Sequence, residues 1–201
     1  SCSYGSMKAH KEFQRLTTIG DNTLYACSGE MSDYQNLKKT LDEKYEEDVI
    51  ENDGALFMGT KEYYNWIAAM QYQRRCRNNP QLITTVMAGF EGSQSFLGTV
   101  DSRGLKVEEN FVATGFGNYF CQVLLTNHWR ADMEEAEARA LLQECLKVMF
   151  WRDKAGHDQF QVGTITPAGV KIGPVERLDT NKNFRFFHEL TNDHFRPINI
   201  R

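Results

Sequence analysis

The 201-residue sequence has little of what marks a secreted or membrane-embedded chain. Its five cysteines are an odd count, widely spaced and without a C-x-x-C pair. It contains no Asn-x-Ser/Thr glycosylation acceptor and no apolar run near the length that crosses a bilayer. We therefore expect free thiols buried in a reducing interior, and neither a disulfide framework nor a membrane-bound protein.

The chain also has no excess of positive charge and no cluster of metal-ligand residues. The formal net charge is −4, which disfavours a nucleic-acid or anionic-membrane partner for the chain as a whole. The histidines show no H-x-x-x-H or clustered spacing, so we expect no metal site and no cofactor. Arg74, Arg75 and Arg77 form a basic cluster in the last turn of an expected helix, where cations complement the helix dipole. A phosphate-binding role is the alternative for this cluster.

The first part of the chain is typical of a hairpin followed by two long helices. Phe13–Ile19 and Thr23–Ser28 are β-type runs on either side of a Gly-Asp-Asn turn. Ser32 is the expected N-cap of the first helix and Thr60 that of the second, which ends near Pro80. The predicted apolar stripes are Tyr34, Leu37, Leu41, Tyr45 and Val49, then Tyr63, Trp66, Ile67 and Met70.

Beyond the second helix the hydrophobic period becomes that of strands. Leu82–Phe90 and Ser95–Asp101 are predicted to pair through a Glu-Gly turn, and Leu105–Val107 and Phe111–Ala113 follow as shorter runs. A long helix over Met133–Asp153 has acidic residues at its start and basic residues at its end.

The last elements complete a grouped order of strands and helices. Phe160–Thr166 and Val170–Val175 predict a hairpin, and a helix is one interpretation of Asn181–Leu190. Grouped elements favour an α+β fold, with two packed antiparallel sheets and the helices outside. We expect one domain over residues 1–190 and a tail over residues 191–201.

The stretch Phe111–Trp129 contains a tight turn, Gly115-Phe116-Gly117, followed by apolar residues at helical spacing. Tyr119, Val123 and Asn127 fall on one stripe of this predicted helix, with Phe120 and Leu124 beside them. Such a turn points backbone N–H groups at whatever lies in front of the helix. It could open a dinucleotide fingerprint, but Phe120 stands where the third small residue belongs and no βαβ context surrounds it. The residue chemistry alone therefore assigns no active site.

A colinear set of short blocks carries a family resemblance. The blocks are Ser3–Ser6, Ala26–Gly29, Tyr72–Arg75, Asn79-Pro80, Ser95–Asp101, Ala113–Gly117, Trp151–Asp153 and Phe160–Val162. Together they resemble the β-type subunits of the eukaryotic 20S proteasome, a threonine peptidase family, and most closely its non-catalytic seventh β class. The resemblance runs in order from the first residue to about Leu190.

This resemblance implies an architecture and a set of partners. The fold would be the four-layer α-β-β-α sandwich of N-terminal-nucleophile hydrolases, with the opening strand missing from this chain. The function would be that of a structural β subunit in a 28-subunit hetero-oligomer of α- and β-type subunits. That particle degrades proteins in an ATP- and ubiquitin-dependent way in the cytoplasm and nucleus. The tail Thr191–Arg201 would clamp the opposite ring, with Phe195, Arg196 and Ile198 at the interface.

The resemblance also implies that the catalytic positions are degenerate. Active members use an amino-terminal threonine supported by a lysine, an acid and two serines. Arg15 stands at the lysine position, and a guanidinium keeps the charge but cannot be tuned toward neutrality. Phe116 and Gly156 stand at the serine positions without a hydroxyl, while Asp153 retains the acid. We therefore expect an inactive member with no catalytic residue and no substrate-binding site of its own.

The alternative is a catalytic threonine-protease subunit whose nucleophile lies upstream of this chain. Ser1 or Cys2 could be a nucleophile in principle, because an amino-terminal hydroxyl or thiol has its own amine beside it. Both align within a hairpin and not at the strand that presents the nucleophile, so we do not expect either to react.

Overall fold

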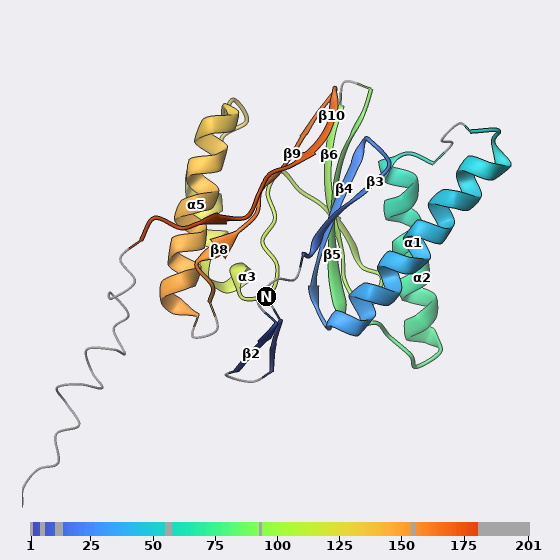
Figure 1. Ribbon diagram of the computed structural model, residues 1–201, viewed down its shortest axis with the longest axis horizontal. Coiled ribbons are helices and arrows are strands. Elements are labelled where there is room, and N and C mark those ends of the chain that lie inside the picture. Colours follow the sequence, from blue (N-terminus) through green and yellow to red (C-terminus); the bar gives the residue numbers. More distant parts are fainter. Residues whose placement is uncertain are drawn as a thin grey trace, which may run out of the picture.

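The computed structural model describes residues 2–4, 7–10, 14–54, 58–92, 94–153 and 156–180. Its centre is a five-stranded antiparallel sheet in the order β3-β4-β5-β6-β7 (Figure 1). These strands are β3 (Leu16–Ile19), β4 (Thr23–Gly29), β5 (Ile83–Glu91), β6 (Gln94–Val100) and β7 (Lys106–Glu108). The predicted first hairpin and the predicted central pair of strands are therefore confirmed. Phe111–Ala113, expected as a strand, belongs to no strand.

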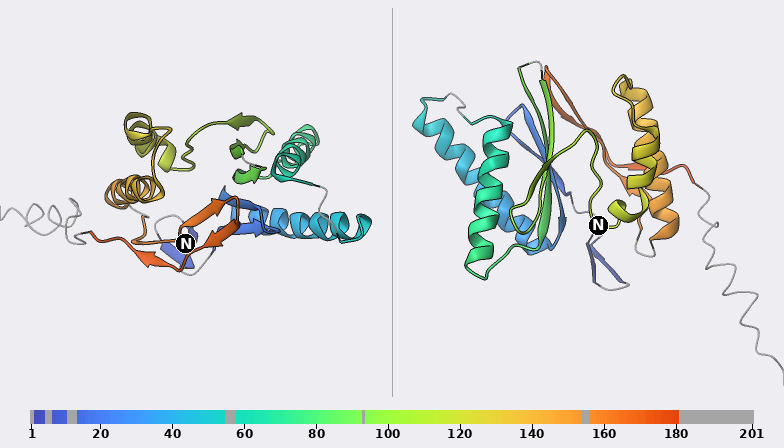
Figure 2. Two further views of the ribbon diagram at one scale, coloured as in Figure 1. Left: turned by 90° about the horizontal axis from the view of Figure 1, so that it is seen from above. Right: turned by 180° about the vertical axis from the view of Figure 1, so that it is seen from behind.

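Two helices cover one face of this sheet (Figures 1 and 2). They are α1 (Met31–Glu51) and α2 (Thr60–Cys76). Alternate residues of the strands point at them, because side chains of a strand alternate between its faces. The resulting core contains Ile19, Tyr25, Cys27, Tyr34, Leu37, Leu41, Tyr63, Tyr64, Ile67, Ala68, Ile83, Met87, Phe96 and Val100. The predicted stripes supplied much of it, whereas Tyr45, Trp66 and Met70 pack at its margin.

Both predicted helix caps are wrong by one or two residues. Glu30 is the N-cap of α1, and its carboxylate accepts from the Met31 N–H at 3.0 Å. Gly59 is the N-cap of α2, and Thr60 is instead the first helical residue. The Thr60 side chain is buried and forms a 2.7 Å hydrogen bond with the Thr23 hydroxyl, so the hydroxyl serves helix-to-sheet packing and not the cap.

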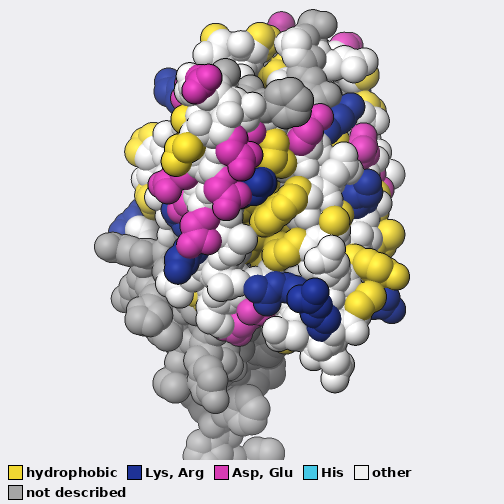
Figure 3. Space-filling view, turned by 90° about the vertical axis from the view of Figure 1, so that its right-hand side faces the viewer, with side chains coloured by type: hydrophobic (Ala, Val, Ile, Leu, Met, Phe, Trp, Pro, Cys, Tyr) yellow, Lys and Arg dark blue, Asp and Glu magenta, His cyan; other side chains and the backbone are white. Residues whose placement is uncertain are grey.

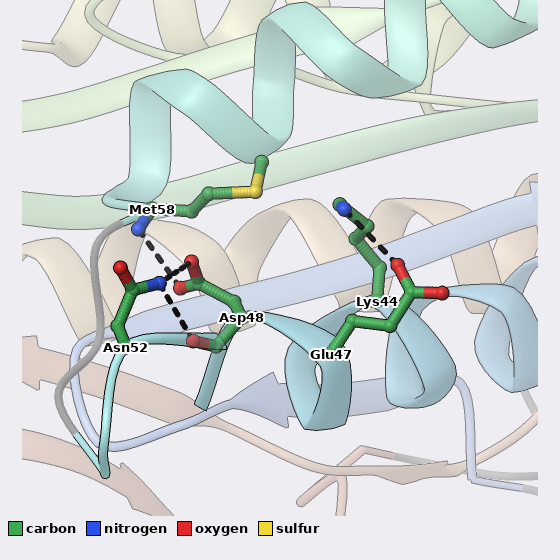
Figure 4. Close-up of polar contacts among 5 residues, drawn as sticks. All are labelled: Lys44, Glu47, Asp48, Asn52 and Met58. Carbon is green, nitrogen blue, oxygen red and sulfur yellow. Dashed lines mark hydrogen bonds and ion pairs between the residues drawn. The ribbon is translucent and has the colours of Figure 1, made fainter. Parts of the chain in front are cut away.

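A buried carboxylate joins the end of α1 to the start of α2 (Figure 4). The Asp48 side chain is 6% exposed and accepts from the Met58 N–H at 2.9 Å and from Asn52 Nδ2 at 3.1 Å. Asn52 Nδ2 also donates to the Asp48 carbonyl oxygen at 2.7 Å, which satisfies one carbonyl at the helix end. One turn earlier, Lys44 and Glu47 form an exposed 3.1 Å ion pair.

A second set of strands follows α5 in the sequence, and the hairpin of two of them lies against the opposite face of the sheet (Figures 1 and 2). These are β8 (Gln159–Phe160), β9 (Gly163–Thr166), β10 (Gly169–Ile172) and β11 (Glu176–Arg177). β9 pairs with β10, as predicted, and β8 pairs with β11. The approach to β4 is close, because a Cβ on Gly163 would lie 2.6 Å from Leu24 Cδ2. The Val170 N–H also donates to the Asp21 carbonyl oxygen at 3.0 Å.

The remaining helices, α3 (Gly117–Phe120), α4 (Gln122–His128) and α5 (Glu135–Arg152), pack around a second core. Its buried members are Cys121, Leu125 and Cys145. The residues predicted to share one helical stripe are divided between two helices: Tyr119 in α3 and Val123 in α4 are 76% and 62% exposed. Phe120 and Leu124, predicted beside that stripe, pack against the second core. The chain breaks between α3 and α4 at Cys121, so burial follows Cys121 and Leu125 instead.

Side chains connect α5 to the second set of strands. Arg139 forms an ion pair with Glu176, and the Thr164 hydroxyl donates to a Glu135 carboxylate oxygen at 3.3 Å. The predicted long helix is thus confirmed, with its start moved from Met133 to Glu135.

Several expectations fall at the chain ends. β1 (Cys2–Tyr4) pairs with β2 (Met7–His10), which agrees with the hairpin expected for Cys2. Ser1, the helical interpretation of Asn181–Leu190 and the tail Thr191–Arg201 lie outside the described residues. Among the helices that the structure describes, none is both long and apolar enough to span a membrane.

Candidate functional site at the glycine turn

Two backbone N–H groups at the glycine turn donate to carbonyl oxygens of the turn itself. Gly115 has φ of 59°, a left-handed conformation that glycine adopts without strain. The Gly117 N–H donates to the Thr114 carbonyl oxygen at 3.1 Å, and the Asn118 N–H donates to Gly115 at 3.2 Å. The Phe116 side chain is 60% exposed. The turn therefore sets the geometry of the helix start, and these two N–H groups are not aimed at a ligand.

Arg15 is bound to the end of β4. Its Nη1 donates to the carbonyl oxygens of Cys27 at 3.3 Å and of Gly29 at 3.1 Å. The glycine turn approaches the same strand end, because a Cβ on Gly115 would lie 3.9 Å from Ser28 Cβ. The structure thus brings Arg15 and the glycine turn to neighbouring residues of β4. There the guanidinium supports the backbone, and it cannot accept a proton.

Asp153 and Gly156 form a compact turn after α5. Asp153 is the C-cap, and its N–H donates to the Met149 carbonyl oxygen at 2.9 Å. The Gly156 N–H donates to the Asp153 carbonyl oxygen, also at 2.9 Å. A Cβ on Gly156 would lie 2.9 Å from that oxygen, 3.1 Å from the Met149 oxygen and 3.1 Å from Phe150 Cα. Because all three are backbone atoms, a serine at this position requires the backbone to move.

A hollow of about 320 Å³ lies beside the glycine turn. Its lining residues include Thr84, Thr99, Thr114 and Glu109. Phe116 is not one of the lining residues. Thr99 and Thr114 lie in two of the blocks that carry the resemblance, whereas Thr84 lies in none. The available signal was strand alternation, which places Thr84 and Thr99 on the face opposite the core residue Met87.

The three buried thiols are not activated nucleophiles. Cys27, Cys121 and Cys145 are buried and free, whereas Cys76 is free and exposed, contrary to the expectation of buried thiols. Burial raises the pKa of the Cys27 thiol to about 11 and that of Cys145 to about 12, and it also raises the pKa of Cys121. The thiolate is the nucleophilic form, so these groups are inert near neutral pH. Among residues that the structure describes, no three His, Cys, Asp or Glu side chains gather as a metal site.

These features define the class of the protein. It is an α+β protein of antiparallel sheets, with long helices on one face and a glycine turn leading into a helix near the far face. Residues 1–165 match the proteasome subunit family, so the chain belongs to that family. The family implies the α+β fold of N-terminal-nucleophile hydrolases.

Known relatives carry the names of β subunits. "Proteasome subunit beta type-4" of Arabidopsis thaliana is 35% identical over 189 residues, covering 94% of this chain and 76% of the relative. The protein of the same name in Xenopus laevis is 34% identical, covering 92% and 76%. "Proteasome subunit beta type-7" of Saccharomyces cerevisiae is 27% identical, covering 81% and 65%. The sequence-based recognition of a β-type proteasome subunit is confirmed.

Proposed function

We propose that this chain is a structural β subunit of the 20S proteasome core that cleaves no peptide itself. It builds the β ring around the proteolytic chamber, in a hetero-oligomer with other α- and β-type subunits. The family match and the names of the relatives support this role. In this proposal the fold is the four-layer sandwich of its family, with α1 and α2 as one outer layer and α3, α4 and α5 as the other. The particle works in the cytoplasm and nucleus.

The packing around Gly156 is the observation that carries the loss of catalysis. A supporting serine needs a Cβ and a hydroxyl, and the Cβ position is already within 3.1 Å of backbone atoms. Arg15 adds to this, because its guanidinium holds two carbonyl oxygens and is not available as a proton acceptor. Phe116 adds an exposed ring where a hydroxyl is required. Asp153 remains as part of the turn after α5.

Exposed apolar side chains support burial by neighbouring subunits. Phe116, Tyr119 and Val123 are each at least 60% exposed along α3 and α4. Single exposed hydrophobic residues are ordinary, but a run of them on successive turns is typical of an interface. We further propose that the tail Thr191–Arg201 clamps the opposite ring. Deleting this tail is expected to impair the joining of half-barrels, measured by native mass spectrometry, and unchanged joining would contradict the clamp.

A threonine-directed covalent probe tests the main proposal. Particles purified from cells are treated with the probe, and the labelled subunits are identified by mass spectrometry. We expect this chain in the particle and unlabelled, while catalytic subunits of the same particle are labelled and serve as the internal control. Labelling of this chain would establish the alternative, a catalytic subunit with its nucleophile upstream. Recovery of the chain only as a monomer would contradict both.

A further inference from the structure

The carboxyl-terminal end of α2 gathers positive charge around a hollow. Arg74 and Arg75 lie in the last turn of α2 and Arg77 is its C-cap; we call these residues the arginine cluster. The chain reverses there, since Asn78 has φ of 55° and the Arg77 N–H still donates to carbonyl oxygens of the last turn. The hollow has a volume of about 290 Å³, and its lining is Met70, Gln73, Arg74, Arg77 and Asn79.

A chain of amides holds this end of the helix in place. Arg74 Nη2 donates to Asn36 Oδ1 at 3.1 Å, and Gln81 Nε2 donates to the same oxygen at 3.0 Å. Gln71 Nε2 in turn donates to Gln81 Oε1 at 3.1 Å, and both glutamines are 1% exposed. The Arg74 guanidinium is thus oriented by neutral partners before any charged group arrives. Such preorganisation reduces the entropy lost on binding.

The arginine cluster has charge that the described chain does not neutralise. No member of it lies within 4.0 Å of a carboxylate among the described residues. The acidic side chains of α1 behave differently, because Asp42 and Glu43 pair with lysines one turn away. Figure 3 shows the side that carries α1 and α2: acidic side chains follow one column, and basic side chains gather at the lower end of a hydrophobic furrow.

We propose that the arginine cluster docks an acidic segment, with Asp or Glu side chains, of a neighbouring proteasome subunit. Guanidinium groups bind carboxylates through paired, charge-assisted hydrogen bonds. Tyr72, three residues before Arg75, and Leu82, five residues after Arg77, are 55% and 63% exposed and so are open to apolar contact with a partner. Exposed Tyr and Arg together are typical of interface hot spots. The acidic column on the same side repels an extended polyanion, so a short acidic segment fits better than nucleic acid. This inference rests on the proposed function.

Zero-length cross-linking tests the docking in the intact particle. In the variant Arg75→Lys/Arg77→Lys, the charge remains and a carbodiimide can join a lysine amine to any carboxylate in contact. We expect a cross-link from position 75 or 77 to an Asp or Glu of another proteasome subunit. The matched control is Arg103→Lys, because Arg103 pairs with Asp101 of its own chain at 3.2 Å. That control should give an internal cross-link.

The outcomes separate this inference from the proposed function. The docking is overturned, and the proposed function is left intact, if the chain is present in the particle but positions 75 and 77 give no cross-link to an Asp or Glu of another subunit. That result includes cross-links that are only internal, cross-links only to phosphorylated residues, and no cross-link at all. A chain absent from the particle overturns both. As a second measurement, Arg75→Glu/Arg77→Glu should compete for incorporation about tenfold less well than wild type, whereas Arg103→Glu should compete equally. Equal incorporation of both variants overturns the docking.

Discussion

The packing at Gly156 makes a quantitative prediction about the substitution Gly156→Ala. The added Cβ would meet the Asp153 carbonyl oxygen at 2.9 Å, inside the distance that real Cβ atoms keep, and two more backbone atoms at 3.1 Å. Backbone atoms cannot rotate away as a side-chain end can. Forcing an extra carbon into a packed region costs about 1–3 kcal/mol. For a chain of this size, about 3 °C of melting temperature is lost per kcal/mol, so we expect a decrease of about 3–9 °C.

A second glycine near the candidate site is the matched control. A Cβ on Gly117 would lie 3.6 Å from Ala113 Cβ, an ordinary contact, and Gly117 lies in α3. Gly117→Ala should therefore stabilise the chain by about 0.4–1 kcal/mol, because alanine loses less backbone entropy on folding. Circular dichroism melts of the full chain measure both variants. If Gly156→Ala melts at or above the wild-type temperature, the position has room for a side chain. The structural reason given above for the missing serine would then be wrong.

Three further predictions concern the core and its titration. Leu41→Ala should lower the free energy of urea unfolding by about 2–5 kcal/mol because Leu41 is 0% exposed, whereas Ile50→Ala, at a 77% exposed site of the same helix, should lower it by less than about 0.5 kcal/mol. Equal losses of stability in the two variants would contradict the core assignment. Thr60→Val should lower the free energy of unfolding by about 1–3 kcal/mol, because it leaves the Thr23 hydroxyl unpaired. The double variant Thr23→Val/Thr60→Val should lose less stability than the two single variants added together, and an additive loss would argue against the hydrogen bond. Burial raises the pKa of Cys27 from 9.0 to about 11, so the stability that comes from keeping this thiol protonated is complete below pH about 9 and is lost as the pH rises toward about 11. The urea midpoint of the wild type should fall over that range, and that of Cys27→Ala should fall less steeply; equal falls in the two proteins would contradict the prediction.

The sequence predicts those parts of the fold in which one face alone is apolar. In α1, Tyr34, Leu37 and Leu41 recur at helical spacing among charged residues, so only one orientation buries them. The helix after the glycine turn fails this condition, because apolar residues occur all around it and Cys121 interrupts it. Which side is buried is decided there by the packing of α5, which no local pattern contains.

The helix caps were mispredicted for a related reason. Ser32 and Thr60 are good capping residues by type, but capping is settled by which side chain reaches the free N–H groups. Glu30 reaches the Met31 N–H, and the Thr60 hydroxyl is taken by Thr23 from a strand that lies 37 residues earlier. A contact at that separation depends on how α2 packs on the sheet, which no local pattern contains. Likewise, the sequence could place Arg15 at a lysine position but could not show which carbonyl oxygens the guanidinium binds.

In the function that we propose, the candidate site keeps the frame of a catalytic centre and lacks its chemistry. The frame persists: the glycine turn starts a helix, Asp153 caps α5, and Arg15 lies at the end of β4. The chemistry depends on hydroxyls and on an amine whose pKa can be tuned, and the packing at two positions is unfavourable for these groups. At Arg15, replacement by lysine would remove a donor that holds two carbonyl oxygens. At Gly156, a hydroxyl would require the backbone to open. Because these changes also support local structure, reversing them one at a time would cost stability before any step of catalysis returned. The inactive state that we propose is therefore maintained by the packing of the fold itself.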